Sequence, residues 1–305
     1  MRVVAIVTAR NEAIHIVSAL AALIAEGLEV ILIDHESTDE TVALARLFLG
    51  RGLLGIERLR WTGRFSLVEQ LEAKERVIEQ LDCDWIVHAD ADERLTSPVP
   101  GQTLIEGLRA ADQGAFNAVH FSEFVFVPRR GEDLYRQDYR RYATRYYFYR
   151  PTYPYLQRAW KHRDGLSNSE YAGHLLTGTV RQYPLDFRLR HYIVLSEEHA
   201  VRKYVGRPFS DAELARGFHY DRVGLTADAL RFPADDAPQM RTLPDWTLGP
   251  FDTSEPVTDH FWRWTDREEL VGPDVTPATS AAGHRADDQQ RFVSAGYRLG
   301  ERRVG

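Results

Sequence analysis

Residues 85–93 read Trp-Ile-Val-His-Ala-Asp-Ala-Asp-Glu, an apolar run that ends in three carboxylates, Asp90, Asp92 and Glu93. The apolar part is typical of a buried strand, and the acidic part follows it without a break. Like charges this close together are unfavourable unless a cation compensates for them. Hard divalent cations such as Mg²⁺ and Mn²⁺ prefer oxygen ligands of this kind. From these residues alone, a metal site and a solvated acidic turn are equally good interpretations.

The sequence before this stretch alternates short apolar runs with helical patterns, which is typical of a parallel sheet built from βαβ units. Polar residues with N-cap spacing stand before each expected helix. We expect Asn11 to cap the first helix, Ser37 and Glu40 to start the second as a capping box, and Ser66 to start the third. The sequence therefore predicts an α/β domain with strands at residues 3–7, 30–33, 56–59 and 85–89.

Asp34 and Asp90 each follow the last residue of an expected parallel strand. In open α/β sheets, ligands bind in the crevice outside the carboxyl ends of the strands. Aspartate also favours turns, so either residue alone is compatible with a purely structural role. Together they indicate where a binding site is to be sought.

Composition excludes several classes of protein. The chain has 305 residues, 44% of them hydrophobic, and a net charge of −7 from 38 basic and 45 acidic residues. This balance argues against nucleic-acid binding, which usually requires a basic surplus. Cys83 is the only cysteine, so no intramolecular disulfide can form. Since no apolar run approaches the ~20 residues of a membrane span and no leader precedes residue 3, we expect a cytoplasmic protein without a transmembrane segment, which can still act at a membrane surface.

Three motifs occur in order: Val-Thr-Ala-Arg-Asn-Glu at residues 7–12, Ile-Asp-His-Glu-Ser-Thr-Asp-Glu-Thr at residues 33–41, and the stretch at residues 85–93. Further along, Arg-His-Tyr at residues 190–192 is followed by Ser196 and Lys203. Together these motifs resemble the nucleotide-sugar domain of family 2 glycosyltransferases, in the branch whose strand-end aspartate pair is followed by glutamate. The resemblance covers about the first hundred residues well.

The resemblance implies a GT-A type fold, a Rossmann-like and mostly parallel central sheet flanked by helices, with a less regular C-terminal extension. It divides the chain into a glycosyltransferase domain at residues 1–206 and an extension at residues 207–305. Residues 1–98 would form the half that binds the nucleotide-sugar, and residues 99–206 the half on the acceptor side. The extension is expected to be partly helical, with a mobile tail from about Pro273.

The same resemblance implies roles for single residues. Asp92 would ligate Mn²⁺ or Mg²⁺ directly and His191 would complete the metal site, with Asp90 and His174 as further candidates. His35-Glu36 departs from the Asn-Gly that many relatives carry at this turn. The donor would be bound by Thr8, Ala9, Arg10, Glu12, Asp34, Lys74, Asp90 and Ala91.

The function implied is transfer of a sugar from a nucleoside-diphosphate donor to an acceptor hydroxyl, such as that of a glycan, with inversion. Asp92 would act through the metal on the leaving group, and Asp164 is the first candidate for the base that deprotonates the acceptor. One alternative is a non-catalytic relative that binds nucleotide-sugar or glycan. Another is a sugar-nucleotide pyrophosphorylase, which would need a glycine-rich basic loop where residues 8–11 read Thr-Ala-Arg-Asn. The Arg- and Tyr-rich residues 135–158 fit either an acceptor site or a homodimer contact.

Overall fold

The computed structural model of the chain describes residues 1–150, 155–244 and 249–264. Its centre is a parallel sheet, and the carboxyl ends of its strands therefore meet at one edge. This confirms the expected α/β class, and its four strands overlap the predicted apolar runs, with ends that differ by up to three residues. The strands run in the order β3 (Leu53–Arg58), β2 (Glu29–Asp34), β1 (Val3–Ala9) and β4 (Trp85–Asp90).

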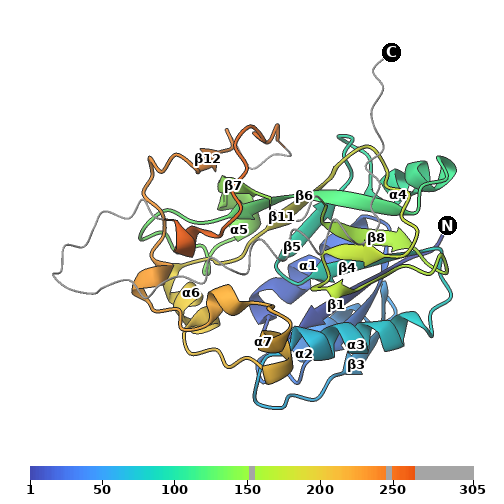
Figure 1. Cartoon of the computed structure of the whole chain (residues 1–305), viewed down its shortest axis with the longest axis horizontal. Helices are drawn as coiled ribbons and strands as arrows, with labels where there is room; N and C mark the ends of the chain where they lie inside the picture. The colour runs from blue at the N-terminus through green and yellow to red at the C-terminus, as the bar shows by residue number, and fades with distance from the viewer. Residues whose placement is uncertain (151–154, 245–248, 265–305) are drawn as a thin grey trace. The chain divides into compact units, whose positions relative to one another are not determined.

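Antiparallel strands extend this sheet beyond β4 (Figure 1). The strand β8 (Gln157–Lys161) pairs with β4, and β6 (Ala118–Phe126) pairs with β8. Two further strands lie beside β6: β11 (Phe187–His191) runs parallel to β6, and β5 (Glu93–Thr96) runs antiparallel to β11. The remaining strands are β7 (Arg145–Tyr149) and β12 (Arg241–Thr242), which continue the sheet from β6, and the separate pair β9 (Ser167–Tyr171) and β10 (Leu175–Thr177).

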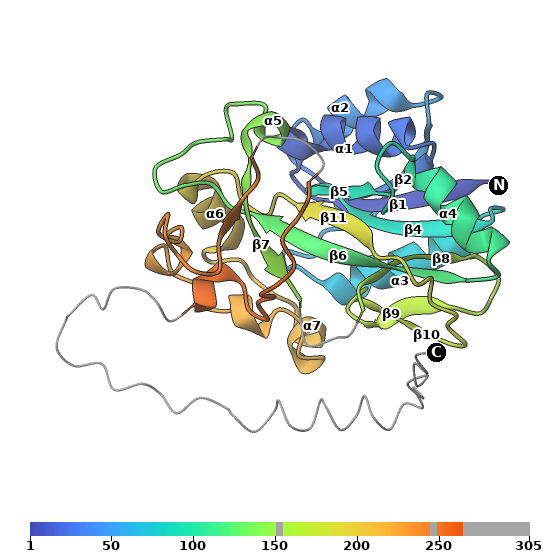
Figure 2. The same ribbon diagram turned by 90° about the horizontal axis from the view of Figure 1, so that it is seen from above.

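Helices cover both faces of the parallel sheet (Figure 2). One face carries α1 (Ala13–Ala25) and α2 (Thr41–Ala45), the latter continued by a 3₁₀ turn at Arg46–Phe48. The opposite face carries α3 (Leu67–Ile78). The strands are apolar on both faces because both are covered, as is usual for parallel sheets. The helix α4 (Leu104–Gln113) shares the core of α1, where Leu20, Leu104 and Leu108 are fully buried.

The helix starts were only partly predictable. Ser66 caps α3 as expected, because its side chain accepts a hydrogen bond from the Glu69 N–H. The expectations for Asn11 and Ser37 were wrong. Asn11 has φ of 57° and its Oδ1 accepts from the Thr38 N–H at 2.7 Å, so it joins two loops and does not cap α1. Ser37 likewise uses its hydroxyl to accept from the Asn11 N–H at 2.9 Å.

The segment after residue 206 contains short helical turns and little regular structure. Its apolar side chains form a cluster with Val125 and Tyr147 of the sheet. Drawn in yellow to orange, it lies beside the carboxyl edge of the sheet in both views (Figures 1 and 2). The boundary after residue 206 stays a prediction, and the tail from Pro273 lies outside the described residues. The helical elements between residues 139 and 264 are α5 (Tyr139–Tyr142), α6 (Glu197–Tyr204), α7 (Asp211–Ala215) and 3₁₀ turns at Tyr220–Arg222, Asp228–Leu230 and Phe261–Arg263.

Much of the Arg- and Tyr-rich stretch at residues 135–158 is internal. The Arg145 side chain, for example, donates to the carbonyl oxygens of Pro128 and Pro233 at 3.2 and 3.1 Å. The buried side chains therefore hold the fold together, whereas Arg136, Arg141, Tyr142 and Arg150 of the same stretch are exposed. The buried members are Tyr139, Arg145, Tyr146, Tyr147 and Arg158. No helix among the described residues has the length and apolar character to cross a membrane.

Candidate active site

The strand ends bring the expected donor residues together. In the register of the parallel sheet, Ala9 lies opposite Asp34, and Thr8 lies opposite Asp90. The side chain of Thr8 is buried, as is that of Asp34. The three sequence motifs therefore meet at the carboxyl edge of β1, β2 and β4, where ligands of open α/β sheets bind.

One end of this edge is a flat cationic and aromatic surface. The Arg10 guanidinium lies 3.9 Å from the centre of the Trp61 ring and donates to the His35 carbonyl oxygen at 2.6 Å. The Asp34 carboxylate accepts from the Ser37 N–H at 3.1 Å, which fixes the turn after β2. A guanidinium stacked on an indole offers a planar surface of the kind on which a nucleobase packs.

The turn after β2 contains a residue in a left-handed backbone conformation. Glu36 has φ of 51°, in the left-handed region that glycine adopts without a steric cost. The Glu36 carboxylate links this turn to the segment after β3, because one oxygen pairs with Arg58 and the other accepts from the Trp61 N–H at 2.9 Å. The departure at His35-Glu36 therefore preserves the turn and ties Trp61 beside Arg10.

The centre of the edge is Asp92, which is 7% exposed. Its Oδ2 accepts a hydrogen bond from Lys203 Nζ at 2.7 Å and lies 3.4 Å from His191 Nε2. Burial works against the charge of Asp92, but Lys203 and His191 outweigh it and hold the pKa of this carboxyl well below its usual value. Asp92 is therefore ionised at neutral pH. Ala91 beside it is buried and packs in the main core.

A second ion-pair group fixes Asp90. Arg158 Nη2 lies 2.7 Å from Glu93 Oε1 and 3.3 Å from Asp90 Oδ2. The other oxygen of Glu93 accepts from the Asp90 N–H at 3.0 Å. The Glu93 side chain is fully buried, whereas that of Asp90 is 37% exposed. Glu93 thus fixes the backbone of Asp90, and the partly exposed carboxylate of Asp90 remains accessible to a ligand.

His191 is held by a third carboxylate. Its Nδ1 lies 2.7 Å from Oε1 of Glu123, a residue of β6 that is 7% exposed. Burial lowers the pKa of His191, but Asp92 and Glu123 outweigh that effect and raise it well above its usual value. The raised pKa means that both ring nitrogens carry protons, Nδ1 toward Glu123 and Nε2 toward Asp92, and a metal ion bound at Nε2 would displace the proton there. Glu123 therefore sets the orientation of the ring.

Lys74 and Glu12 are placed at the rim of this carboxylate group. Lys74, on α3, is 2% exposed, and its charge interacts with Asp90 and Glu93. Burial lowers the pKa of Lys74 to about 7. Glu12 is the residue before α1, and its pKa is raised to about 7 by burial, against the opposing charge of Lys203.

Replacing Lys74 is expected to change how stability depends on pH. Between the folded pKa of about 7 and the ordinary value of 10.5, the unfolded chain binds more protons than the folded one, so stability rises with pH. The contribution has a slope of up to about 1.4 kcal/mol per pH unit. Lys74→Met should remove this slope between pH 7.5 and 9.5 in urea titrations, and Lys161→Met should keep it. An unchanged slope in Lys74→Met would contradict the burial of this charge.

The segment after residue 206 adds further cations to the edge. Glu213 anchors it, because this buried carboxylate accepts from the Leu67 N–H and binds His219 Nδ1, both at 2.6 Å. The anchor places Arg222 within the electrostatic field of Asp92, and Arg207 within that of Glu12. A cationic segment beside a ring of carboxylates provides both charge signs that a metal-bound diphosphate requires.

Asp164 does not belong to this edge, so the expectation that it deprotonates the acceptor was wrong. It follows β8, whose Lys161 pairs with Trp85 at the amino end of β4, and Asp90 stands at the opposite end. Its carboxylate accepts from Asn117 Nδ2 at 3.0 Å and pairs with Arg181 at 3.1 Å. Asp164 thus stabilises a surface turn.

His174 lies closer to the site but plays a different part from that expected. It occupies the turn between β9 and β10, and its carbonyl oxygen accepts from the Gln157 N–H at 2.6 Å. Burial lowers the pKa of its side chain to about 3, although Glu123 and Asp90 are near enough to oppose that effect. Among the described residues it does not join Asp92 and His191 in a three-residue metal group.

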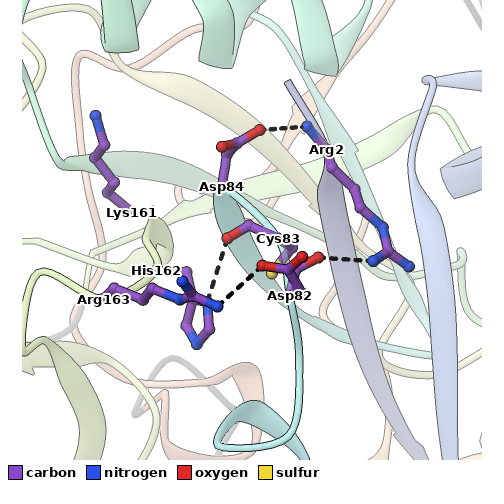
Figure 3. Close-up of a pocket in the computed structure, with 7 residues that line it drawn as sticks. All are labelled: Arg2, Asp82, Cys83, Asp84, Lys161, His162 and Arg163. Carbon is purple, nitrogen blue, oxygen red and sulfur yellow. Dashed lines mark hydrogen bonds and ion pairs between the residues drawn. The ribbon is translucent and has the colours of Figure 1, made fainter.

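A cavity of about 290 Å³ lies at the amino edge of the sheet, away from these residues (Figure 3). Its charges are paired within the protein: Arg163 lies 2.9 Å from Asp82, the Arg2 guanidinium lies 2.5 Å from Glu29, and Asp84 accepts from the backbone N–H of Arg2 at 2.6 Å. Burial raises the pKa of the Cys83 thiol in its wall to about 11, so this cysteine is a poor nucleophile. The charged groups that line this cavity are thus held in contacts within the protein.

Several residues of the site escaped the sequence analysis. Glu123 had a usable signal, because a lone carboxylate inside the apolar stretch at residues 119–127 must be paired when it is buried. Arg158 and Trp61 had none, since arginines and aromatics are frequent around them. Lys203 was noticed only through the resemblance, and its contact with Asp92 depends on how α6 packs.

Comparison with known proteins gives a partial match. No family model matches the chain. A 95-residue segment is 35% identical to an uncharacterized glycosyltransferase of Rickettsia felis, covering 31% of this chain and 30% of that protein. The chain thus matches about a third of the length of this curated relative. The match confirms the resemblance to glycosyltransferases that the motifs indicated.

Solved structures match the chain only at low similarity. TarS of S. aureus (residues 1–349) is 13% identical, with 78% of this chain and 77% of that chain covered and a TM-score of 0.41. Glucosyl-3-phosphoglycerate synthase of Mycobacterium tuberculosis, solved with Mn²⁺, uridine diphosphate and phosphoglyceric acid, is 19% identical. It covers 41% of this chain and 43% of that chain, with a TM-score of 0.27. TM-scores below 0.5 do not establish a common fold.

Proposed function

We propose that this chain is a metal-dependent glycosyltransferase that moves a sugar from a nucleoside diphosphate to an acceptor hydroxyl. The observation that carries the proposal is the pair Asp92–His191, which follows Asp90 at the carboxyl edge of the sheet, the edge that also carries the Arg10–Trp61 surface. The match to a glycosyltransferase sequence supports the same assignment.

The donor set of this pair fits a divalent cation. Asp92 offers a carboxylate oxygen, and His191 offers Nε2 at 3.4 Å from that oxygen, a separation that two ligands of one metal ion can have. Among the described residues no group of three His, Cys, Asp or Glu side chains forms a complete metal cage. Mg²⁺ is usually held in this incomplete way, by one or two protein ligands together with substrate phosphates and water.

The metal, when bound, would act as a Lewis acid on the diphosphate leaving group. The protein's own residues would bind the donor and orient it. The stacked Arg10 and Trp61 would pack against the base, and Asp34, Thr8 and the open side of Asp90 would bind the nucleoside. Arg207 and Arg222 would offset the charge of the departing diphosphate.

Inversion is part of the proposal through the family resemblance. An inverting transfer needs a base near the acceptor hydroxyl, and the position of Asp164 at the far edge removes it from that role.

The proposal is tested by incubating the full chain with UDP-, GDP-, CDP- and dTDP-sugars and Mn²⁺ and measuring release of the nucleoside diphosphate. We expect one donor class to be consumed, with release abolished by a chelator. Nucleotide binding without any release, across a panel of glycan acceptors, would instead support the non-catalytic relative.

Glu123 is expected to be a positioning residue for His191. Glu123→Gln keeps the shape but weakens the bond to His191 Nδ1, so the ring loses its fixed orientation. Outer partners of metal-binding histidines typically contribute about 10- to 100-fold to affinity or activity. We expect Mn²⁺ affinity and kcat/KM to fall together by a factor in this range. Unchanged Mn²⁺ affinity would show that Glu123 does not act through a metal-bound His191.

A further inference from the structure

Lys203 holds the carboxylate that the metal needs. It lies in the last turn of α6, a helix capped by Ser196, whose hydroxyl accepts from the His199 N–H at 3.1 Å. Its Nζ donates to Asp92 Oδ2 at 2.7 Å and to the Ile193 carbonyl oxygen at 3.2 Å. The side chain is 15% exposed, so little water screens the contact.

A metal ion and this ammonium group must therefore share one carboxylate. Asp92 Oδ2 already lies between Lys203 Nζ and His191 Nε2, at 2.7 and 3.4 Å. Two cations a few ångströms apart repel strongly where little water separates them. Glu12 is a second carboxylate whose charge acts on Lys203.

We propose that Lys203 is a resident counter-ion of Asp92 that competes with the divalent metal, so that the enzyme without nucleotide binds the metal weakly. A nucleoside diphosphate brings negative charge that compensates for both cations, and metal and donor then bind cooperatively. This inference rests on the proposed function of Asp92 as a metal ligand. It gives a role to the contact between Lys203 and Asp92.

The test measures Mn²⁺ binding to the full-length chain in the absence of nucleotide, by the electron paramagnetic resonance signal of free Mn²⁺. Lys203→Met should bind Mn²⁺ at least about 10-fold more tightly than the wild type, because the repulsion is gone. Lys203→Arg keeps the charge and should bind like the wild type. The matched control is Lys161→Met, which removes a lysine 2.8 Å from Asp112 at the other edge of the sheet and should change nothing.

Adding UDP, or whichever diphosphate the donor screen identifies, completes the test. The nucleotide should raise the Mn²⁺ affinity of the wild type more than that of Lys203→Met. Equal or weaker Mn²⁺ affinity in Lys203→Met would overturn the role of Lys203 while leaving the metal site in place. Failure of every protein to bind Mn²⁺, with and without nucleotide, would overturn the metal site and this inference with it. Lys203→Gln serves as the second variant if circular dichroism shows that Lys203→Met is misfolded.

Discussion

Asp92→Asn is expected to lower the rate of sugar transfer by about 10³-fold, because a ligand of a catalytic metal contributes several kcal/mol to the transition state and each 1.4 kcal/mol is a factor of ten. Asparagine has nearly the same shape but no charge. Its amide oxygen binds a divalent cation far more weakly than a carboxylate does, and the substitution removes the counter-ion that Lys203 contacts at 2.7 Å. The rate would be followed as release of the nucleoside diphosphate at saturating Mn²⁺.

The chain offers a close control for this substitution. Asp112 also pairs with a lysine, with 2.8 Å between its Oδ1 and Lys161 Nζ, but it belongs to α4 near the amino end of β4. Asp112→Asn should leave transfer within about twofold of the wild type. If Asp92→Asn retains Mn²⁺-dependent nucleotide affinity and normal turnover, Asp92 is not a metal ligand.

Arg158→Met is expected to have the largest effect on stability. Arg158 neutralises the fully buried Glu93 and binds Asp90, with its own side chain 7% exposed. Removing one partner of a buried ion pair costs about 3–5 kcal/mol, because the other charge stays buried without compensation. The free energy of unfolding from urea titrations should fall by that amount near pH 8.

The dependence of this loss on pH follows from Glu93. Burial already raises the pKa of Glu93 to about 7, and without Arg158 it must rise further. The folded state then keeps a proton that the unfolded chain releases near its ordinary value of 4.5, so stability falls as pH rises above that value. The loss in Arg158→Met should therefore be smaller at pH 5 than at pH 8. Adding Glu93→Gln should recover part of it.

An exposed ion pair provides the control for this second prediction. Arg163 and Asp82 are 2.9 Å apart, with side chains 69% and 89% exposed. Arg163→Met should change stability by less than about 1 kcal/mol, as is usual for surface pairs. A comparably small loss in Arg158→Met, equal at pH 5 and pH 8, would mean that Glu93 is not held as a buried charge.

The parallel core was predictable because its signals are local. Each strand is a short apolar run, and the register that sets Ala9 beside Asp34 and Thr8 beside Asp90 follows from βαβ order. The caps at Asn11 and Ser37 were not predictable, because their side chains bond to each other's loops across 26 and 27 positions in sequence. Short polar residues that find such partners leave the helix start to another residue.

The site itself was predictable only where it lies on strand ends. Asp90, Asp92 and His191 carry recognisable motifs, whereas Arg158 comes from an antiparallel strand and Lys203 from a helix whose packing the sequence does not reveal. The prediction that Asp164 lies at the site was wrong because the sequence does not reveal the direction of the strand before it. The place of Asp164 in the chain fitted the acceptor half, but β8 runs antiparallel to β4 and carries Asp164 to the amino edge. The direction of each strand within the sheet decides which residues reach the site, and the composition of the sequence does not reveal that direction.

The central claim is that the carboxyl edge around Asp92 binds a nucleoside diphosphate through a divalent metal. The most direct measurement is the thermal stability of the full chain with UDP, GDP, CDP and dTDP, each with and without Mn²⁺. A ligand present at about 100 times its Kd stabilises the folded state by about 2.7 kcal/mol. We predict a clear rise in Tm for one diphosphate, only when Mn²⁺ is present, and no rise in Asp92→Asn. A response that is independent of Mn²⁺, or no response to any of the four, would contradict the claim.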